Sequence, residues 1–593
     1  MVCASRGSWW CGVLAPLVPA LLYAACWSFE LLHYDDDAYV WRNPLVLGGW
    51  SAESLKDVWT DTTGNLWHPL TILSHQLAVS LGGTAPLIHH ALNHLLFIVV
   101  AAILFEWARS FAELRAAQKQ SAVIAGTVTL LWVCHPQRVE MVAWVSARKD
   151  LLCTLFILGA LIAARRMELS REGRAAWLWA AASALAGLAA CASKPSAVVL
   201  PALLVICRAM YRLLQTPGSV QQKRHGQTVV FWTLFGLMLV ASLITAVVAM
   251  KVQSAGGHAV LAENWQWHHR LGLPPLVVLE SLSSTILPAP QQVMRMHPEA
   301  WYTMRWYQGV LVVVGLSAAA LMGLRKRHST RAGMFALSWC WWLLCLAPVS
   351  GFFPVGNEYF VDRYNTLPHL GLLPALVCLM STAAEGWRST FQIAMACAVA
   401  AVFAGLSLQW LPAWRNDLTL FGAQARLHPR NHKVLVNHAN ALRRNNELDA
   451  ARRNYEQALE SAPTDYKALF SYATLLIQLA QTEPLPESSP HNRGELLAAA
   501  EGFLTRALRS PEARAQAWSR LAQNRLLAGR PDAAMTTLRE GLSRYPNDAG
   551  LWELNAQLLQ TQGDNDAARK AYHRALELAP DAEHLRKRLE TTP

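Results

Sequence analysis

The chain has 593 residues, more than one compact hydrophobic core usually holds, so at least two domains are expected. Its residues are 53% hydrophobic and only 16% charged, and its mean hydropathy is +0.20. Soluble domains usually carry about 25% charged residues, so this composition excludes a protein that is soluble throughout. The net charge of +12 does not indicate nucleic-acid binding, because the basic residues lie in short loops between apolar segments.

The first 410 residues alternate between apolar segments and short polar ones. Eleven apolar segments are candidates for helices that cross about 30 Å of hydrocarbon. They are 10–31, 86–107, 121–135, 150–164, 176–191, 195–211, 229–250, 306–324, 332–350, 366–383 and 390–410. The Pro-rich segment 271–290 is expected to form an interfacial or re-entrant helix instead. We therefore predict an all-α fold in which residues 1–410 form a polytopic membrane bundle of about 11 spans.

Basic residues indicate the orientation of these spans. They gather in alternate loops, at Arg109, Arg115, Lys119, Arg165, Arg166, Arg171, Arg174, Arg208, Arg212, Lys223, Arg224, Arg325, Lys326, Arg327 and Arg331. Because cytoplasmic loops carry such an excess, the other loops are expected on the non-cytoplasmic side. With eleven spans, the C-terminal part of the chain lies on that side as well.

A repeat begins near His428. Its units are marked by Pro429, Pro463, Pro511, Pro546 and Pro580, with spacings of 34, 48, 35 and 34 residues. The long spacing contains a Pro/Ser-rich insertion at 482–493, and AARRNYEQALESAP (450–463) closely matches AARKAYHRALELAP (567–580). This pattern is typical of tetratricopeptide repeats, which stack helix pairs into an α-solenoid. We assign 411–428 to a linker and 429–593 to a solenoid that binds an extended peptide, with a spacer or a dimer contact as the alternatives.

Three consecutive aspartates, Asp35, Asp36 and Asp37, follow the first apolar segment. Adjacent carboxylates repel one another, and partial burial raises the pKa of at least one of them. Such a group can act as a general base toward a hydroxyl, or it can help to bind a divalent metal such as Mg²⁺ or Mn²⁺. The sequence leaves the metal unassigned. A solvated acidic loop is the alternative interpretation.

Further polar residues lie in or beside the loops expected on the same side. Arg148, Lys149 and Arg363 are cations that suit a lipid-linked phosphate, which needs its charge neutralised as it leaves. Residues expected to line the site are Asp37, His68, His89, His90, Asn93, His135, Glu140, Lys194, Asp362 and Tyr364. A basic anchor at a helix end is the alternative for each cation. The histidines lack the spacing of a known zinc site.

The motifs in their order resemble a known family. They are YDD (34–36), WHPLT (67–71), HHALNHLL (89–96), HPQRVEMVAWVSARKDLL (135–152), CASKPS (191–196), VDRYNTLPHLGL (361–372) and WRNDLTLF (414–421), followed by the repeats. Together they resemble the eukaryotic transmembrane O-mannosyltransferases with tetratricopeptide repeats, and above all the bacterial branch of that group. The resemblance implies a glycosyltransferase of the GT-C fold.

The resemblance also implies roles for individual residues. The acidic pair after the first span is the family's catalytic motif, which implies that role for Asp35 and Asp36, whereas Asp37 stands where the family varies. The family's ERKD-like and DRY-like motifs match residues 148–150 and 362–364. His68 departs from the eukaryotic members, which usually have Arg before this proline.

The expected activity is transfer of a sugar, mannose being one candidate, from a polyprenyl phosphate to a protein or glycan acceptor on the non-cytoplasmic face. The solenoid would present the acceptor, and membrane lipid would surround the bundle. We expect a bacterial inner membrane with a periplasmic solenoid, or an endoplasmic reticulum membrane with a lumenal one. A non-catalytic scaffold for envelope proteins is the alternative. A transporter is disfavoured because no internal inverted repeat is evident.

Overall fold

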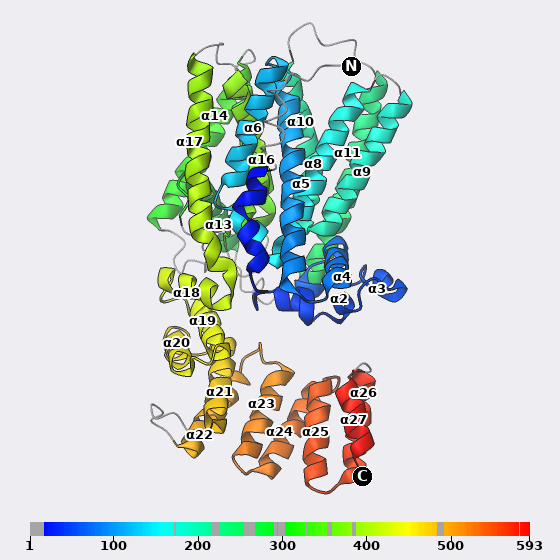
Figure 1. The fold of residues 1–593 in the computed structure, drawn as a ribbon, viewed down its shortest axis with the longest axis vertical. Coiled ribbons are helices and arrows are strands. Elements are labelled where there is room, and N and C mark those ends of the chain that lie inside the picture. Colours follow the sequence, from blue (N-terminus) through cyan, green and yellow to red (C-terminus); the bar gives the residue numbers. More distant parts are fainter. Residues whose placement is uncertain are drawn as a thin grey trace. The chain divides into compact units, whose positions relative to one another are not determined.

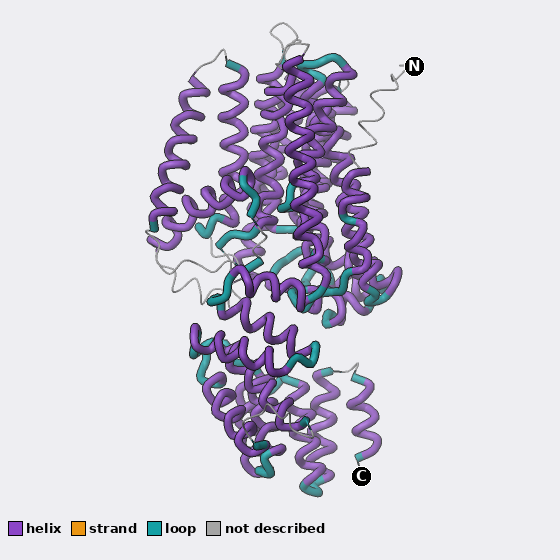
Figure 2. The backbone as a smooth tube through the Cα atoms, turned by 60° about the vertical axis from the view of Figure 1, so that its left-hand side comes forward, coloured by secondary structure: helices purple, strands orange, loops and turns teal. Residues whose placement is uncertain are grey.

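The computed structural model describes residues 17–170, 173–215, 225–253, 267–289, 293–294, 303–325, 329–352, 359–381, 387–482, 492–579 and 582–592. Throughout these residues the regular secondary structure is helical and no strand occurs (Figure 2). The all-α fold predicted from the sequence is therefore confirmed.

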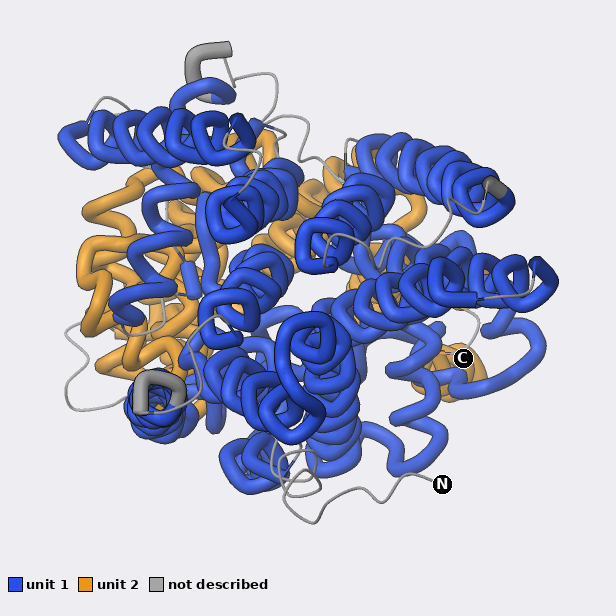
Figure 3. The backbone as a smooth tube through the Cα atoms, turned by 90° about the horizontal axis from the view of Figure 1, so that it is seen from above, with its two compact units in different colours: residues 1–419 blue, residues 420–593 orange. Residues whose placement is uncertain are grey.

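The chain divides into two compact units, residues Met1–Thr419 and Leu420–Pro593 (Figure 3). The segment predicted as a linker, 411–428, is helical for most of its length. It contains the 3-10 helix η9 (Leu411–Arg415) and the helix α18 (Asp417–Leu427).

Long helices form most of the first unit (Figure 1). They are α5 (Pro86–Ala112), α6 (Gln118–Cys134), α8 (Arg148–Leu169), α9 (Gly173–Ser193), α10 (Leu200–Leu214), α11 (His225–Gln253), α13 (Trp267–Ile286), α14 (Met304–Arg325), α15 (Thr330–Leu346), α16 (Thr366–Ser381) and α17 (Trp387–Trp410). Within the described residues, seven stretches are long and apolar enough to cross a membrane: 86–112, 173–193, 195–214, 226–253, 304–325, 330–349 and 390–415. This identifies a membrane protein.

The other four expected spans are also helical, but they are shorter or more charged. An apolar helical stretch covers Leu17–Ser28, and residues 10–16 of that expected span lie outside the described residues. The other three are α6, α8 and α16. Helix α13 runs through Pro274 and Pro275 and covers most of the segment expected at the interface.

Short elements gather where several long helices begin. They include the π-helix η2 (Asp37–Trp41), the helices α2 (Pro44–Leu47), α3 (Ala52–Asp57), α4 (Pro69–Gly82) and α7 (Arg138–Ala143), and the 3-10 helices η4 (Val145–Ala147), η5 (Pro195–Val199) and η8 (Asp362–Asn365). Figure 1 shows α2, α3 and α4 at one end of the long helices of this unit. This end carries the residues predicted to do chemistry.

The second unit is an α-solenoid of four helix pairs. The pairs are α19/α20 (His432–Arg444, Leu448–Ser461), α21/α22 (Tyr466–Gln481, Arg493–Ala507), α23/α24 (Ala515–Leu527, Pro531–Arg544) and α25/α26 (Ala549–Thr561, Asn565–Leu578), followed by α27 (Glu583–Thr591). Side chains cap several first helices, as Asp465 does by accepting from the Ala468 N–H at 2.8 Å. The expected insertion lies between α21 and α22, mostly outside the described residues.

Candidate functional site

Asp36 is a buried anchor for the first loop. Its side chain is fully buried, and its carboxylate accepts hydrogen bonds from the Leu32 N–H at 2.9 Å and from the Ser146 N–H and Oγ–H at 2.8 and 2.5 Å. Ser146 belongs to η4, so the carboxylate ties the acidic loop to the turn that precedes α8. Burial raises the pKa of Asp36 to about 7, against the effect of these hydrogen bonds.

Asp35 has the opposite environment. It is exposed, its carboxylate accepts no hydrogen bond from any described residue, and its φ of 68° lies in the left-handed region, which non-glycine residues rarely adopt. Its charge acts on Lys149 and on Tyr39. Asp37 instead forms an ion pair with Arg42 at 3.2 Å. The three neighbouring aspartates are thus in three different settings.

Trp144 brings the acidic loop and two cations together, although it was not among the residues predicted to form the site. Its ring stacks on Tyr34 with 4.8 Å between ring centroids, and its indole N–H donates to the Tyr34 carbonyl at 2.7 Å. The Lys149 ammonium lies 5.4 Å from the centroid of the Trp144 ring, and the Arg363 guanidinium carbon lies 4.9 Å from it. An aromatic face favours cations at such distances.

Lys149 and Arg363 differ in how their charges are compensated. Lys149 is only 6% exposed, and its ammonium donates to the Tyr39 hydroxyl at 3.2 Å. In the described part of the chain no carboxylate oxygen lies within 4 Å of that ammonium. Arg363 forms an ion pair with Glu140 and also donates its backbone N–H to Glu140 at 3.1 Å. Lys149 is therefore a buried cation that still lacks an anion.

Arg148 was predicted to contact a phosphate, but its three guanidinium nitrogens all donate to the protein. It is fully buried and bonds to Asn93 Oδ1 at 2.6 Å, the Ser74 carbonyl at 3.0 Å and the His89 carbonyl at 2.9 Å. Asn93 in turn donates to the carbonyls of Trp144 and Val145. The geometry suits a brace that joins α4, α5 and α8.

The predicted histidines separate into two groups: His68, His89 and His90 lie on the side of the acidic loop, and His135 lies in another polar cluster. The rings of His68 and His75 lie against the Tyr39 ring, and their centroids are 5.4 Å and 5.6 Å, respectively, from the Tyr39 centroid. His75 also stacks on His89. Burial and then the charge of Lys149 lower the pKa of His68 to about 3, so its ring stays neutral. His90 contacts the Glu30 carbonyl at 3.3 Å.

His135 and Asp362 belong to a separate polar cluster. The His135 ring contacts the Thr285 carbonyl at 3.1 Å and packs on His369. Gln137 contacts Asp362 at 3.5 Å and accepts from Asn365 at 3.1 Å. The structure therefore does not group these two predicted residues with Asp35, even though Arg363 follows Asp362 directly.

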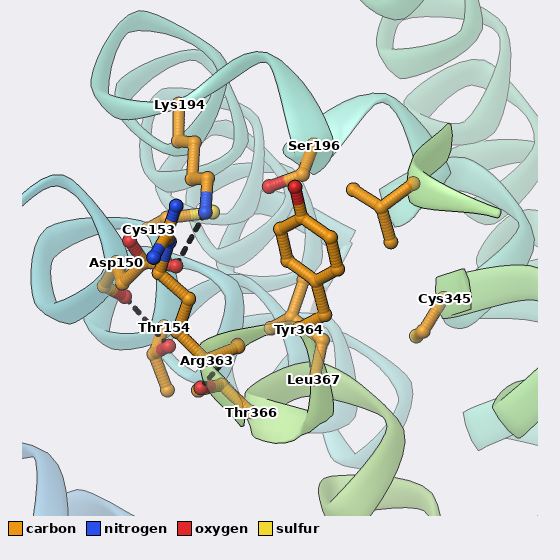
Figure 4. A pocket seen from close by; sticks show the side chains of 11 residues that line it. Asp150, Cys153, Thr154, Lys194, Ser196, Cys345, Arg363, Tyr364, Thr366 and Leu367 are labelled. Atoms are coloured by element: carbon orange, nitrogen blue, oxygen red, sulfur yellow. Dashed lines mark hydrogen bonds and ion pairs between the residues drawn. The ribbon is translucent and has the colours of Figure 1, made fainter. Parts of the chain in front are cut away.

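Lys194 and Tyr364 line a small cavity that is partly open to solvent. Lys194 forms an ion pair with Asp150, and Figure 4 shows this pair across the cavity from Tyr364. Arg363 also lines the cavity. Because Arg363 also lies over Trp144, it joins this cavity to the acidic loop.

The described residues contain no group of three or more His, Cys, Asp or Glu side chains that could hold a metal ion. The donor set around Asp35 therefore does not fit a protein-held Mg²⁺ or Mn²⁺ ion.

Comparisons with known proteins agree with both halves of the chain. Tetratricopeptide-repeat profiles match residues 432–465, 515–558 and 549–582. The human protein O-mannosyl-transferase TMTC3 is 22% identical over 590 residues, covering 87% of this chain and 61% of its own length. The Drosophila melanogaster protein O-mannosyl-transferase Tmtc2 is 30% identical over 201 residues, covering 32% of this chain and 20% of its own length.

The chain spans from a fifth to about three fifths of these relatives. Among solved structures, a thermophilic tetratricopeptide protein of Thermus thermophilus is 22% identical, covering 31% of this chain and 92% of its own, with a TM-score of 0.27. The repeats, the apolar helices and the sequence relatives all indicate the same class of protein. The chain is a membrane protein with tetratricopeptide repeats that is similar in sequence to protein O-mannosyl-transferases.

Proposed function

We propose that this protein is a glycosyltransferase that moves a sugar from a polyprenyl phosphate to a hydroxyl of a protein or glycan acceptor. The observation that carries the proposal is the combination of an exposed aspartate, Asp35, with a buried cation, Lys149. Within the described residues, the Asp35 carboxylate accepts no hydrogen bond and the Lys149 ammonium has no carboxylate partner. One group can accept a proton, and the other can hold a phosphate. Mannose is the sugar that the relatives' names suggest.

Transfer by direct displacement uses these two groups in one step. The acceptor hydroxyl oxygen attacks the anomeric carbon, and Asp35 takes the hydroxyl proton. The bond between the anomeric carbon and the phosphate oxygen breaks, and its electron pair leaves with the polyprenyl phosphate. Lys149 and Arg363 stabilise the negative charge that develops there. This displacement inverts the configuration of the anomeric carbon.

Asp36 acts in this proposal as a positioning residue. Its carboxylate is fully buried and hydrogen-bonded to Leu32 and Ser146, so an acceptor hydroxyl does not reach it. By fixing the loop to η4 it holds Asp35 beside Trp144 and the two cations. Arg148 supports the same turn indirectly, because it donates to Asn93, which donates to the Trp144 carbonyl.

We place the site on the non-cytoplasmic face. Helix α8 begins with Arg148 and Lys149 and carries Arg165 and Arg166 near its other end, about 25 Å away at 1.5 Å per residue. Arg148 and Lys149 are buried within the protein, whereas Arg166 is exposed. Because exposed basic residues favour the cytoplasmic side, we infer that the site lies on the opposite surface. A bacterial inner membrane, with the solenoid presenting the acceptor in the periplasm, fits this orientation.

The proposal is tested by mass spectrometry of glycoproteins from cells that carry the wild-type protein or Asp35→Asn at equal expression. A hexose mass that disappears from defined proteins in the variant supports a transferase and identifies the acceptor. Unchanged glycoproteins, with the solenoid still capturing partners, would replace the proposal with a non-catalytic scaffold.

A further inference from the structure

Two arginines of the solenoid lie on a face formed by the first helices of its units. Arg443 is on α19 and donates to Gln478 Oε1 of α21 at 3.2 Å, and Arg520 is on α23 and donates to Gln523 Oε1 at 3.1 Å. Helices α19, α21 and α23 contact one another in that order. We call this surface the first-helix face. Solenoids of this kind use such faces to hold extended ligands.

Neither arginine has a carboxylate partner in the described part of the chain. Both side chains are half-buried, and Arg443 Nε is buried without a hydrogen-bond partner. Arg525, also on α23, shows the contrast, because it is paired with Glu501 at 2.9 Å. The solenoid thus neutralises one arginine of this helix and leaves another uncompensated.

The two uncompensated charges act on each other. Burial, followed by the positive charge of Arg443, lowers the pKa of Arg520. Like charges in a half-buried setting repel more strongly than in water. Polar groups adjoin them, because the Tyr455 hydroxyl donates to Asn440 Oδ1 at 2.7 Å and interacts with Arg443. An anion between the two guanidinium groups would relieve the repulsion and use their free N–H donors.

We propose that Arg443 and Arg520 form a carboxylate-binding site that selects an acidic segment of polypeptide on the first-helix face. Planar guanidinium groups match carboxylates with two parallel hydrogen bonds. The neutral partners Gln478 and Gln523 hold the arginines in place without cancelling their charge. The inference rests on the proposed role of the solenoid in holding an acceptor, and it does not depend on the transfer chemistry.

Carboxylates come from two sources, acidic side chains and the C-terminus of a chain. The test therefore uses three short fluorescent peptides with the full-length protein in lipid nanodiscs. One is rich in glutamate and amidated at its C-terminus, one is neutral with a free C-terminus, and one is neutral and amidated. Fluorescence anisotropy then gives the affinity for each peptide at low and at high salt.

The glutamate-rich peptide is expected to bind at least about tenfold more tightly than the neutral amidated one, and its affinity should fall with salt. Arg443→Gln and Arg520→Gln should each weaken it by about tenfold or more, with unchanged circular dichroism. Arg539→Gln is the matched control, because Arg539 is an exposed arginine of α24, and it should change binding by less than about twofold.

Stronger binding of the neutral peptide with a free C-terminus would overturn the assignment to acidic side chains and point to chain ends. Equal affinity for all three peptides would overturn the carboxylate site but leave a polypeptide-binding solenoid. Absence of binding by every peptide would overturn both. None of these outcomes bears on Asp35, whose loss is read from glycoprotein masses, so failure of this site and failure of the transferase proposal are distinguishable.

Discussion

Replacing Asp35 and Asp36 separately by asparagine should have two different results. Asp35→Asn removes the proposed base, which typically costs about 10²- to 10⁴-fold in rate. Its free energy of unfolding should stay within about 0.5 kcal/mol of wild type, because the carboxylate makes no hydrogen bond and asparagine tolerates a positive φ well. Activity and stability should therefore separate at this position.

Asp36→Asn should lose stability first. The carboxylate accepts backbone N–H groups on both oxygens, from Leu32 on one and from Ser146 on the other. An amide has one oxygen, so its NH2 group must face one of these donors. Leaving a buried donor unpaired costs about 1–3 kcal/mol. Activity should fall only as far as the loop loosens.

The assay combines glycoprotein mass spectrometry with thermal unfolding of the purified protein in nanodiscs. Asp37→Asn is the matched control, since among the described residues the Asp37 carboxylate makes only an ion pair with the exposed Arg42. This variant should preserve both activity and stability. Asp35→Gly should fold at least as well as wild type, because glycine accepts the positive φ, and it should be inactive. The reasoning is refuted if Asp36→Asn unfolds like wild type yet is inactive while Asp35→Asn remains active.

Four further changes test the site. Arg148→Lys keeps the charge but loses at least one of three buried hydrogen bonds, so thermal unfolding should show a loss of about 2–4 kcal/mol. Lys149→Met should lower transfer about tenfold or more, with a raised KM for the lipid donor and undiminished stability, since a buried uncompensated charge is removed. The Asp417 carboxylate contacts the His33 backbone N–H at 3.0 Å and the His33 ring nitrogen Nδ1 at 2.8 Å. Asp417→Asn should weaken both contacts, so amide hydrogen exchange in the first loop should become faster and transfer should fall several-fold. Asp36 has a folded pKa of about 7 against 3.8, so the folded state binds the extra proton and stability falls as pH rises through that window. The stability gap between wild type and Asp36→Asn should narrow from about pH 5 to about pH 7, and a constant gap would contradict this sign.

Much of the fold could be predicted from the sequence because it depends on local patterns. Apolar length sets a membrane helix, and the seven stretches that meet both criteria coincide with seven expected spans. The repeat period of 34 residues is the length of one helix pair, so the solenoid could be located from prolines alone. Because apolar length is the signal for a membrane helix, the shorter helices α6 and α16 carry a weaker signal.

The division of labour within the site could not be predicted in this way. Asp35 and Asp36 are chemically identical neighbours, and they are distinguished only by a backbone turn that buries one and exposes the other. Arg148 and Lys149 are likewise adjacent, yet helical geometry sends one to Asn93 and the other to Tyr39. Trp144 lies in the motif of residues 135–152, and an aromatic residue shortly before the cations Arg148 and Lys149 was the available signal.

Two unfavourable free-energy contributions at the site support the proposed catalytic role. A left-handed aspartate costs about 1 kcal/mol or more, and a buried ammonium without a carboxylate is unfavourable as well. Either cost alone could be a local accident of packing. Both occur around one tryptophan, beside cations that are compensated, as Arg363 is by Glu140 and Lys194 by Asp150. Among the described residues these neighbouring charges are paired, whereas the Lys149 ammonium has no carboxylate within 4 Å. An unpaired buried cation is the arrangement that the proposed anionic donor requires.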